Sequence, residues 1–292
     1  MSRRFALFAN PRAAGGRALR ALAKARAELD ARGAEYRVVE TADVEHVRAQ
    51  AAEAAGRRET VVAIGGDGLV GVVAGGLRES EGSLAIVPSG RGNDFARVLK
   101  IPTDAVEATR VALDGEERRL DVGFVDGSPF VGIASLGFDS DANRIANDAK
   151  LVRGNLVYLY AALRAFAGWK HARFEVTVDG ERHEFTGYSV AMGNSKAYGG
   201  GMLLFPQAKL DDGRLEVMMV REHSKLRALR DLPSVFKGTH VDNPYCKFVS
   251  GEVVEVRADR PFEVYADGDP IGALPAKVTV AKQVLRVIVP RS

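Results

Sequence analysis

The chain has 292 residues, which is enough for one large domain or two of ordinary size. Hydrophobic residues make up 46% of it and charged residues 27%, as is typical of a soluble globular protein, and the net charge of +3 gives no indication of a nucleic-acid partner. The single cysteine, Cys246, excludes an internal disulfide, and no window of 18 uncharged apolar residues predicts a transmembrane helix. The first apolar run is too short for a signal peptide. We therefore expect a cytoplasmic protein that contacts a membrane only peripherally.

Short apolar runs alternate with helical stretches in the first part of the chain. The predicted strands are 5–9, 35–40, 61–64 and 83–87. The predicted helices are the basic stretch before Gly33, residues 44–55, the apolar segment after Gly68, residues 93–99 and residues 103–113. This alternation predicts βαβ units and a mostly parallel sheet, with ligands at the carboxyl ends of the strands.

Beyond about Asp121 the pattern changes to short strands separated by Gly and Asp turns. The expected strands are 130–135, 174–178, 188–192, 215–220, 253–257 and 262–265, and two helical stretches are expected at 141–149 and 156–167. Such a pattern predicts a mainly antiparallel β-sandwich. We therefore place a domain boundary between residues 123 and 124.

The most informative stretch is VVAIGGDGLVGVVAGG, residues 61–76. A buried strand, a glycine turn and a helix in this order present backbone N–H groups to an anionic ligand, commonly phosphate. Asp67 lies in the middle of this turn, where its carboxylate would repel phosphate unless a metal or cation intervened. The alternative is a tight turn with a solvated acid. The combination favours Mg-nucleotide chemistry.

Three other stretches have both a structural and a functional interpretation. PSGRGNDFAR contains glycines and arginines suited to phosphate, but Asn93 or Asp94 could equally cap the following helix. Asp267-Gly268-Asp269 alone predicts a hairpin turn, and residues 211–213 predict either a turn or a cation site. The histidines show no metal spacing, and the sequence has neither a Walker P-loop nor a G-x-G-x-x-G after a strand.

Taken together, the motifs resemble those of the diacylglycerol kinase catalytic family, bacterial lipid kinases related to sphingosine kinases. The matching blocks are NPRAAGG, IGGDG, PSGRGNDFAR, RLDVG, ASLGFDSD, AMGNSKAYGGGMLLFPQAKLDDGRLEV and YADGDPIGALPAKVTV. The GGDG loop alone is also similar to NAD kinases and 6-phosphofructokinases, whereas the long block in the second half favours the lipid kinases.

The resemblance implies a doubly wound α/β domain that binds ATP, residues 1–123, to which a terminal strand in 281–292 returns. It implies a β-sandwich, residues 124–280, that helps to bind a diacylglycerol-like lipid. The nucleotide contacts that it implies are Asn10, Thr41, Gly65, Gly66, Asp67, Gly68, Leu69, Gly71, Gly90, Arg91 and Asn93.

The resemblance also implies two Mg²⁺ sites and a proton acceptor. Asp67, Asp94 and Asp121 would hold Mg²⁺ near the transferred phosphate, and the turn with Lys209, Asp212 and Arg214 would hold a structural Mg²⁺. Asp267 is the favoured base for the lipid hydroxyl, with Asp269 kept as the second candidate because it stands where the family usually has Glu.

Two departures concern the nucleotide. Leu69 and Arg91 each replace a threonine that is usual in the family, so each position lacks a hydroxyl that could contact phosphate. A kinase of a soluble alcohol, similar to NAD kinase or acting on a sugar or nucleoside, and a nucleotide- or lipid-binding protein without turnover are the alternatives. The apolar stretch 156–169 is interpreted as a buried helix or as a contact with acyl chains at the inner face of the membrane. A homodimer is left open.

Overall fold

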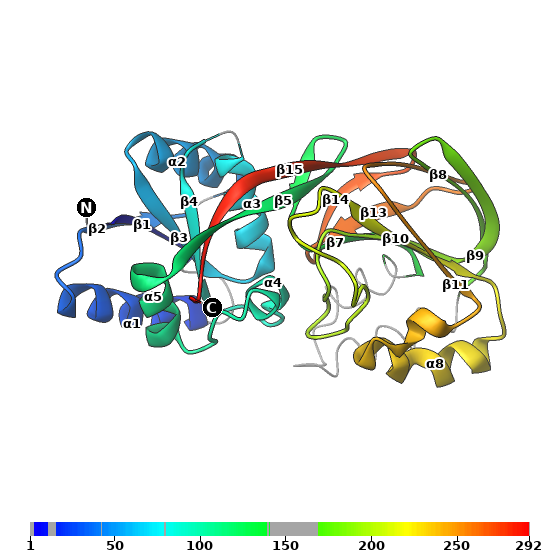
Figure 1. Cartoon of the computed structure of the whole chain (residues 1–292), viewed down its shortest axis with the longest axis horizontal. Coiled ribbons are helices and arrows are strands. Elements are labelled where there is room, and N and C mark those ends of the chain that lie inside the picture. The colour runs from blue at the N-terminus through cyan, green and yellow to red at the C-terminus, as the bar shows by residue number, and fades with distance from the viewer. Residues whose placement is uncertain are drawn as a thin grey trace. The chain divides into compact units, whose positions relative to one another are not determined.

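The structure, a computed structural model, describes residues 3–10, 16–41, 43–78, 80–138, 140 and 169–291. The chain divides into two compact units, each described here by itself (Figure 1). Unit 1 comprises Met1–Val122 and Ala281–Ser292, and unit 2 comprises Gly123–Val280. Both divisions fall within long strands, β5 (Glu116–Val125) and β15 (Ala276–Val289), so each of these strands contributes residues to both units.

Unit 1 contains a parallel sheet of short, buried apolar strands. They are β1 (Arg4–Ala9), β2 (Tyr36–Glu40), β3 (Glu59–Gly65) and β4 (Ser83–Pro88). Their order is β4-β3-β1-β2, and the last part of β15 pairs in parallel with β4 through Arg286 and Val287. Because β1, β3 and β4 are apolar along nearly their whole length, they suit a sheet that is covered on both faces.

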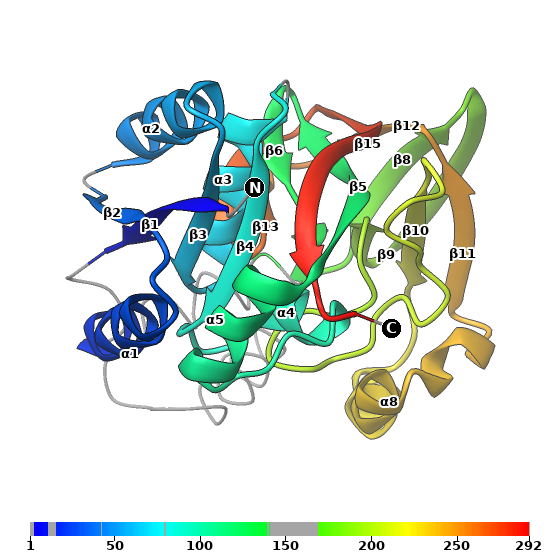
Figure 2. The same ribbon diagram turned by 60° about the vertical axis from the view of Figure 1, so that its left-hand side comes forward.

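The helices of unit 1 cover that sheet. They are α1 (Arg17–Ala31), α2 (Val44–Gly56), α3 (Asp67–Leu77), α4 (Asp94–Val98) and α5 (Ala105–Asp114). The starts of two of them are capped by acids: the carboxylates of Asp43 and Asp104 accept backbone N–H groups of the first turns of α2 and α5. Helix α1 packs with α5 and α2 packs with α3, the two pairs on opposite faces of the sheet (Figures 1 and 2).

Unit 2 is built from antiparallel strands around β9 (Glu181–Gly193). The first half of β9 pairs with β8 (Ala172–Val178), and the second half lies between β7 (Ile133–Gly137) and β10 (Leu215–Arg221). The remaining strands are β6 (Ser128–Phe130), β11 (Cys246–Gly251), β12 (Val253–Ala258), β13 (Glu263–Ala266) and β14 (Asp269–Ala273). Helix α8 (Lys225–Lys237) and the short 3₁₀ helix η2 (Thr239–Asp242) lie between β10 and β11 in the sequence.

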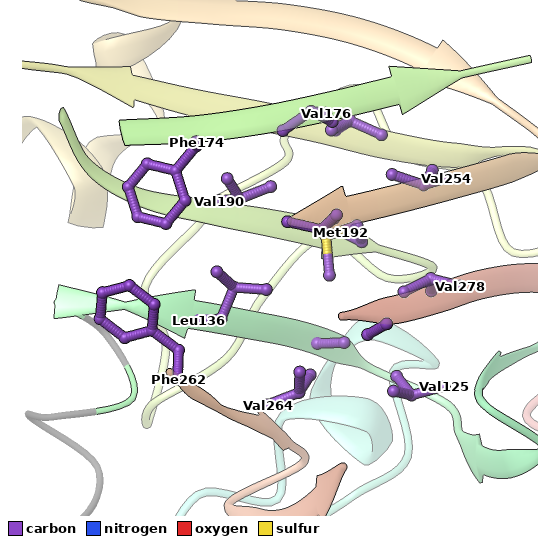
Figure 3. Packing of buried hydrophobic residues seen from close by; sticks show 14 of the residues in the cluster. Val125, Leu136, Phe174, Val176, Val190, Met192, Val254, Phe262, Val264 and Val278 are labelled. Atoms are coloured by element: carbon purple, nitrogen blue, oxygen red, sulfur yellow. The ribbon is translucent and has the colours of Figure 1, made fainter. Parts of the chain in front are cut away.

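The main core of unit 2 lies between these strands. Side chains from β7, β8, β9, β12 and β13 point toward one another in Figure 3, with Leu136, Phe174, Val190 and Val264 among them. All four are fully or almost fully buried. Alternation of buried and exposed residues along β8 and β12 places one face of each strand in this core.

The fold class is the predicted one: a parallel α/β unit and an antiparallel, sandwich-like unit. The structure differs from the sequence reading in detail. The expected strand 130–135 is divided between β6 and β7, with a bend at Val131 and Gly132. The helical stretches expected at 141–149 and 156–167 lie outside the described residues. Within the described ranges, no helix is long and apolar enough to cross a membrane.

Candidate active site

The nucleotide contacts implied by the resemblance follow the carboxyl ends of the parallel strands of unit 1. Asn10 follows β1, Thr41 follows β2, and the turn that begins at Gly65 ends β3. Backbone hydrogen bonds hold neighbouring strand ends together: the Thr41 N–H donates to the Ala9 carbonyl at 3.2 Å, and the Ser89 N–H to the Gly65 carbonyl at 2.8 Å. Since carboxyl ends of parallel strands lie at one edge of a sheet, these positions share the edge at which such sheets bind ligands.

Two glycine loops touch at this edge. A Cβ atom added to Gly90 would lie 2.4 Å from the Cα of Gly66, and one added to Gly66 would lie 3.1 Å from the Cα of Gly90. The loop at Gly90 is closed by Asn93, whose backbone is left-handed (φ 53°) and whose Oδ1 accepts the Gly90 N–H at 2.8 Å. The glycines are therefore required for the contact between the loops.

Asp67 joins the two loops. Its carboxylate accepts the backbone N–H groups of Asp94 at 3.2 Å and of Phe95 at 3.1 Å, at the start of α4. The negative charge in the first loop is thus balanced in part by the positive end of a short helix in the second. Asp94 is itself buried and binds the Arg97 guanidinium at 2.5 Å.

The two residues that depart from the family pattern lie in different surroundings. A Cβ on Gly65 would lie 2.7 Å from Cδ2 of Leu69, so the leucine packs over the backbone of its own loop. Arg91 is exposed. Gly71, which the resemblance gives as a nucleotide contact, is buried inside α3.

Two hydroxyl groups at this edge stand out. The residues Thr41 and Ser89 are 9% and 8% exposed, and within the described part of the chain neither hydroxyl oxygen has a hydrogen-bond partner. Leaving a buried hydroxyl unpaired costs about 1–3 kcal/mol. A ligand or water with polar atoms would remove this cost. Ser89 was not singled out from the sequence, although its place directly after β4 was a usable signal.

Asp121 lies in β5 and is fully buried. Its carboxylate accepts the backbone N–H of Gln283 at 2.7 Å, and Gln283 has a left-handed backbone (φ 51°) within β15. The described residues contain no group of three or more His, Cys, Asp or Glu side chains arranged to hold a metal ion. The hydrogen bonds described above connect Asp67 with the loop that carries Asp94, and they connect Asp121 with β15.

In unit 2, Asp267 and Gly268 form the tip of the hairpin between β13 and β14. Both have positive φ, 52° and 98°, which is the backbone of a tight two-residue turn. The Asp267 carboxylate accepts the backbone N–H groups of Val131, Gly132 and Ile133, at 2.9, 3.0 and 3.3 Å. A Cβ on Gly132 would lie 2.3 Å from this carboxylate. Asp267 therefore holds the bend between β6 and β7 against the hairpin.

Asp269 differs from Asp267 in its surroundings. It is the first residue of β14 and is exposed as a residue, yet neighbouring protein atoms displace water from the carboxyl group, and this desolvation raises its pKa. A raised carboxyl pKa brings the group nearer to the range in which a base accepts and releases protons. Of the two candidate bases, Asp269 has the carboxyl with the raised pKa, whereas the Asp267 carboxylate is engaged by three backbone N–H groups.

The turn from Lys209 to Arg214 is closed by its own acid. Asp212 accepts the Arg214 N–H at 3.1 Å, and Gly213 has φ 73°. The Arg214 guanidinium binds the carbonyl of Ser250 at 2.5 Å. Asp212 is exposed. Its carboxylate and the backbone carbonyls of the turn are the oxygen ligands that suit a hard cation.

Comparison with known proteins places these features in one family. The family described as the diacylglycerol kinase catalytic domain matches residues 4–125, and the YegS C-terminal NAD kinase beta sandwich-like domain matches residues 132–289. A diacylglycerol kinase of Mycobacterium tuberculosis is 31% identical over 290 residues, covering 97% of this chain and 94% of the relative. The chain belongs to the diacylglycerol kinase family. The chain is also similar to a protein of Chromohalobacter salexigens named "Probable lipid kinase YegS-like", at 33% identity over 72% of this chain and 69% of the relative.

A solved structure agrees with the fold of this diacylglycerol kinase family member. The structure of a diacylglycerol kinase from Bacillus anthracis superposes with a TM-score of 0.80 and covers 99% of this chain and 97% of its own, at 23% identity. As a member of the family, the chain is an enzyme of the lipid kinase class.

Proposed function

We propose that this kinase transfers the γ-phosphate of ATP, with Mg²⁺, to the hydroxyl group of diacylglycerol or a similar lipid. The observation that carries the proposal is the pair of touching glycine loops, joined by Asp67 at the carboxyl edge of a parallel sheet. The names of the relatives supply the class of acceptor. The enzyme would act at the inner face of the membrane without spanning it.

On the nucleotide side, unit 1 supplies donors without side-chain bulk. Glycines at 66 and 68 put no side chain over the backbone of the first loop, so phosphate oxygens can approach its N–H groups closely, whereas the Gly90 N–H is already bound to Asn93 Oδ1. The buried hydroxyls of Thr41 and Ser89 gain partners when a polar ligand occupies this edge. The exposed Arg91 guanidinium takes the place of the missing threonine hydroxyl by pairing with phosphate.

In this proposal Asp67, Asp94 and Asp121 would each offer Mg²⁺ or its bound water a carboxylate of the type that the ion prefers, since the described side chains do not form one cluster of three acids. When bound, the metal neutralises charge on the phosphate oxygens. The chain's own contribution is to keep Asp67 in place through two N–H groups of the second loop. A second Mg²⁺ in the turn with Lys209, Asp212 and Arg214 would be structural.

On the lipid side, we assign proton removal to Asp269. The oxygen of the lipid hydroxyl forms a bond to the γ-phosphorus, the bond from that phosphorus to the bridging oxygen of ADP breaks, and the hydroxyl proton passes to the Asp269 carboxylate. Asp267 acts through the backbone: it holds the bend at residues 131–133 against the hairpin that carries Asp269.

The test is incubation of the purified chain with γ-labelled ATP and Mg²⁺, first with a total lipid extract and separately with water-soluble alcohols, sugars and nucleosides. We expect label in a lipid product with the mobility of a phosphorylated diacylglycerol. Label only in a soluble product would support a kinase of a soluble alcohol. Tight ATP binding with no labelled product from either panel would support a binding protein without turnover.

A further inference from the structure

Helix α8, KLRALRDLPSVFK, has one face anchored to unit 2. The Ser224 hydroxyl accepts the Arg227 N–H at the start of the helix, and Gly238 ends it with φ 70°. Ala228 packs against the main core of unit 2, and Val235 against a smaller core around Phe205. These contacts determine which face of the helix remains outward.

The outward face is apolar in its centre. Leu226 is 80% exposed and Phe236 is 52% exposed, and Pro233 is exposed as well. At about 100° per residue, these three positions fall within an arc of about 80° on the helix. Val241 in the following η2 is also exposed. A cluster of large exposed apolar side chains, unlike a single one, indicates a surface that contacts another protein or a membrane.

The same face carries only positive charge. Lys225, Arg230 and Lys237 are exposed and lie at or near the edges of the apolar arc. The single acid of the helix, Asp231, lies toward the other side, where the Asn243 amide donates to it at 2.9 Å and Arg227 lies 3.6 Å away. Arg230 also reaches Asp231, at 3.5 Å, so part of its charge is offset.

We propose that this outward face of α8, defined by Lys225, Leu226, Arg230, Pro233, Phe236 and Lys237, docks the kinase on the surface of an anionic lipid bilayer. An apolar arc bordered by lysine and arginine is the pattern of helices that lie in the plane of a membrane interface. Anionic leaflets attract such cations, whereas a neutral protein surface offers them no partner. The inference rests on the proposed function in one respect: the acceptor lipid is held in such a bilayer. Helix α8 packs with η2, and both views place α8 at the margin of unit 2 (Figures 1 and 2).

The test is sedimentation of the full chain with vesicles of phosphatidylcholine alone and of phosphatidylcholine mixed with phosphatidylglycerol. We expect binding to the anionic vesicles that weakens as salt is added, because exposed charges are screened. The double variant Leu226→Asp/Phe236→Asp is expected to lower this binding on the order of tenfold or more, since two apolar side chains no longer enter the interface. Lys225→Glu/Lys237→Glu is expected to lower binding to anionic vesicles and to leave binding to neutral vesicles unchanged.

The matched control is Leu19→Asp, which makes the same change at an exposed leucine of α1 in unit 1. It is expected to bind vesicles as the wild-type chain does, with all variants giving the same circular dichroism spectrum. Unchanged binding in the folded α8 variants, or equal loss in Leu19→Asp, would overturn the proposal. Self-association that depends on Leu226 and Phe236, with vesicle binding unaffected, would assign the face to a second copy and overturn it as well.

The activity of the same variants separates this inference from the proposed function. Transfer of phosphate to diacylglycerol presented in detergent micelles is expected to stay at the wild-type rate in the α8 variants. Transfer to diacylglycerol within anionic vesicles is expected to fall with binding. If the wild-type chain phosphorylates no lipid in either form, the proposed function fails, while vesicle binding that depends on α8 would still support the docking face.

Discussion

At the scale of single residues, Asp67 is both a hydrogen-bond acceptor that supports the fold and the acid that joins the two glycine loops. Asp67→Asn keeps one oxygen for the N–H groups of Asp94 and Phe95, so we expect it to cost about 1 kcal/mol of unfolding free energy. Turnover should fall about 100-fold or more, because the substitution removes the negative charge that we propose to hold Mg²⁺. Asp67→Ala should cost about 1–3 kcal/mol, since it leaves both N–H groups unpaired. Denaturant unfolding and kcat measure the two effects separately, and an Asp67→Asn enzyme with wild-type kcat would remove the acid from the mechanism.

Asp269 provides a prediction on pH. If it is the base, kcat/KM should rise as pH rises through the raised pKa of its carboxyl, and Asp269→Asn should lose this limb together with about 100-fold or more of the rate. Desolvation favours the protonated carboxyl in the folded state. The contribution of the Asp269 carboxyl to stability is therefore fully present below the ordinary carboxyl pKa, and it is lost as pH rises through the raised pKa.

The raised pKa of Asp269 also predicts how its substitution changes the stability of the fold. Asp269→Asn should raise Tm slightly at neutral pH and change it less in acid, the shift being small because solvent reaches the side chain. Asp267→Asn, the paired variant, should instead lower Tm, because it weakens the hydrogen bonds to residues 131–133. A profile in which Asp267→Asn removes the pH limb and Asp269→Asn keeps it would reverse the two roles.

At the scale of elements, the contact of the two glycine loops leads to a third prediction. Gly90→Ala places a Cβ 2.4 Å from backbone, which cannot yield as a flexible side chain does, so the loops must separate. We expect a loss of roughly 1–3 kcal/mol in stability and a weaker affinity for ATP. Gly56→Ala is the control: nothing lies within 4 Å of its Cβ, and it ends α2 without a positive φ, so stability should be equal or slightly higher. Calorimetric ATP titration of both variants is the measurement, and equal affinity would show that the loop contact does not shape the nucleotide site.

The elements also show how far sequence reasoning reaches. The strand, turn and helix at 61–76 were predictable because apolar runs and glycines act locally, and the structure has β3, Gly66 and α3 there. Helix α8 was not predicted, because Pro233 and four basic residues obscure its pattern and its exposed face is not apolar enough to be seen as a core helix. The hydrogen bonds from residues 131–133 to Asp267 join positions more than 130 apart in the sequence, and no local signal encodes them. The predicted metal and nucleotide roles remain predictions.

At the scale of the whole molecule, β5 and β15 distinguish this chain from two domains joined by linkers. The division between the units falls inside both strands, so unit 1 is made of two separate stretches of sequence, and unit 2, although continuous, is joined to unit 1 at both of its ends. Unit 1 takes residues 281–292 from the far end of the chain. We propose that Asp121 helps to hold Mg²⁺. Its carboxylate accepts a hydrogen bond from the backbone N–H of Gln283 in that returning segment. The candidate site of unit 1 is therefore completed only when the last residues of the chain have folded.

The last prediction follows from this arrangement. Leu285, Val287, Ile288 and Val289 are buried in unit 1, and each contributes roughly 1.5–3 kcal/mol by burial. Their sum, roughly 6–12 kcal/mol, is comparable with the entire stability of an ordinary domain, about 5–15 kcal/mol. A chain that ends at Val280 also leaves β4 without its parallel partner at Ser83 and Leu84.

We therefore expect the chain ending at Val280 to lose cooperative unfolding of unit 1 and to bind no ATP. A chain ending at Pro290 keeps all of β15 and removes the exposed Arg291, and it should match the full chain. Hydrogen exchange resolves the outcome by unit: protection should disappear from β1, β3 and β4 in the shorter chain. Retention of that protection would mean that the burial of β15 contributes far less than its area suggests, and that unit 1 is held together by its own four parallel strands.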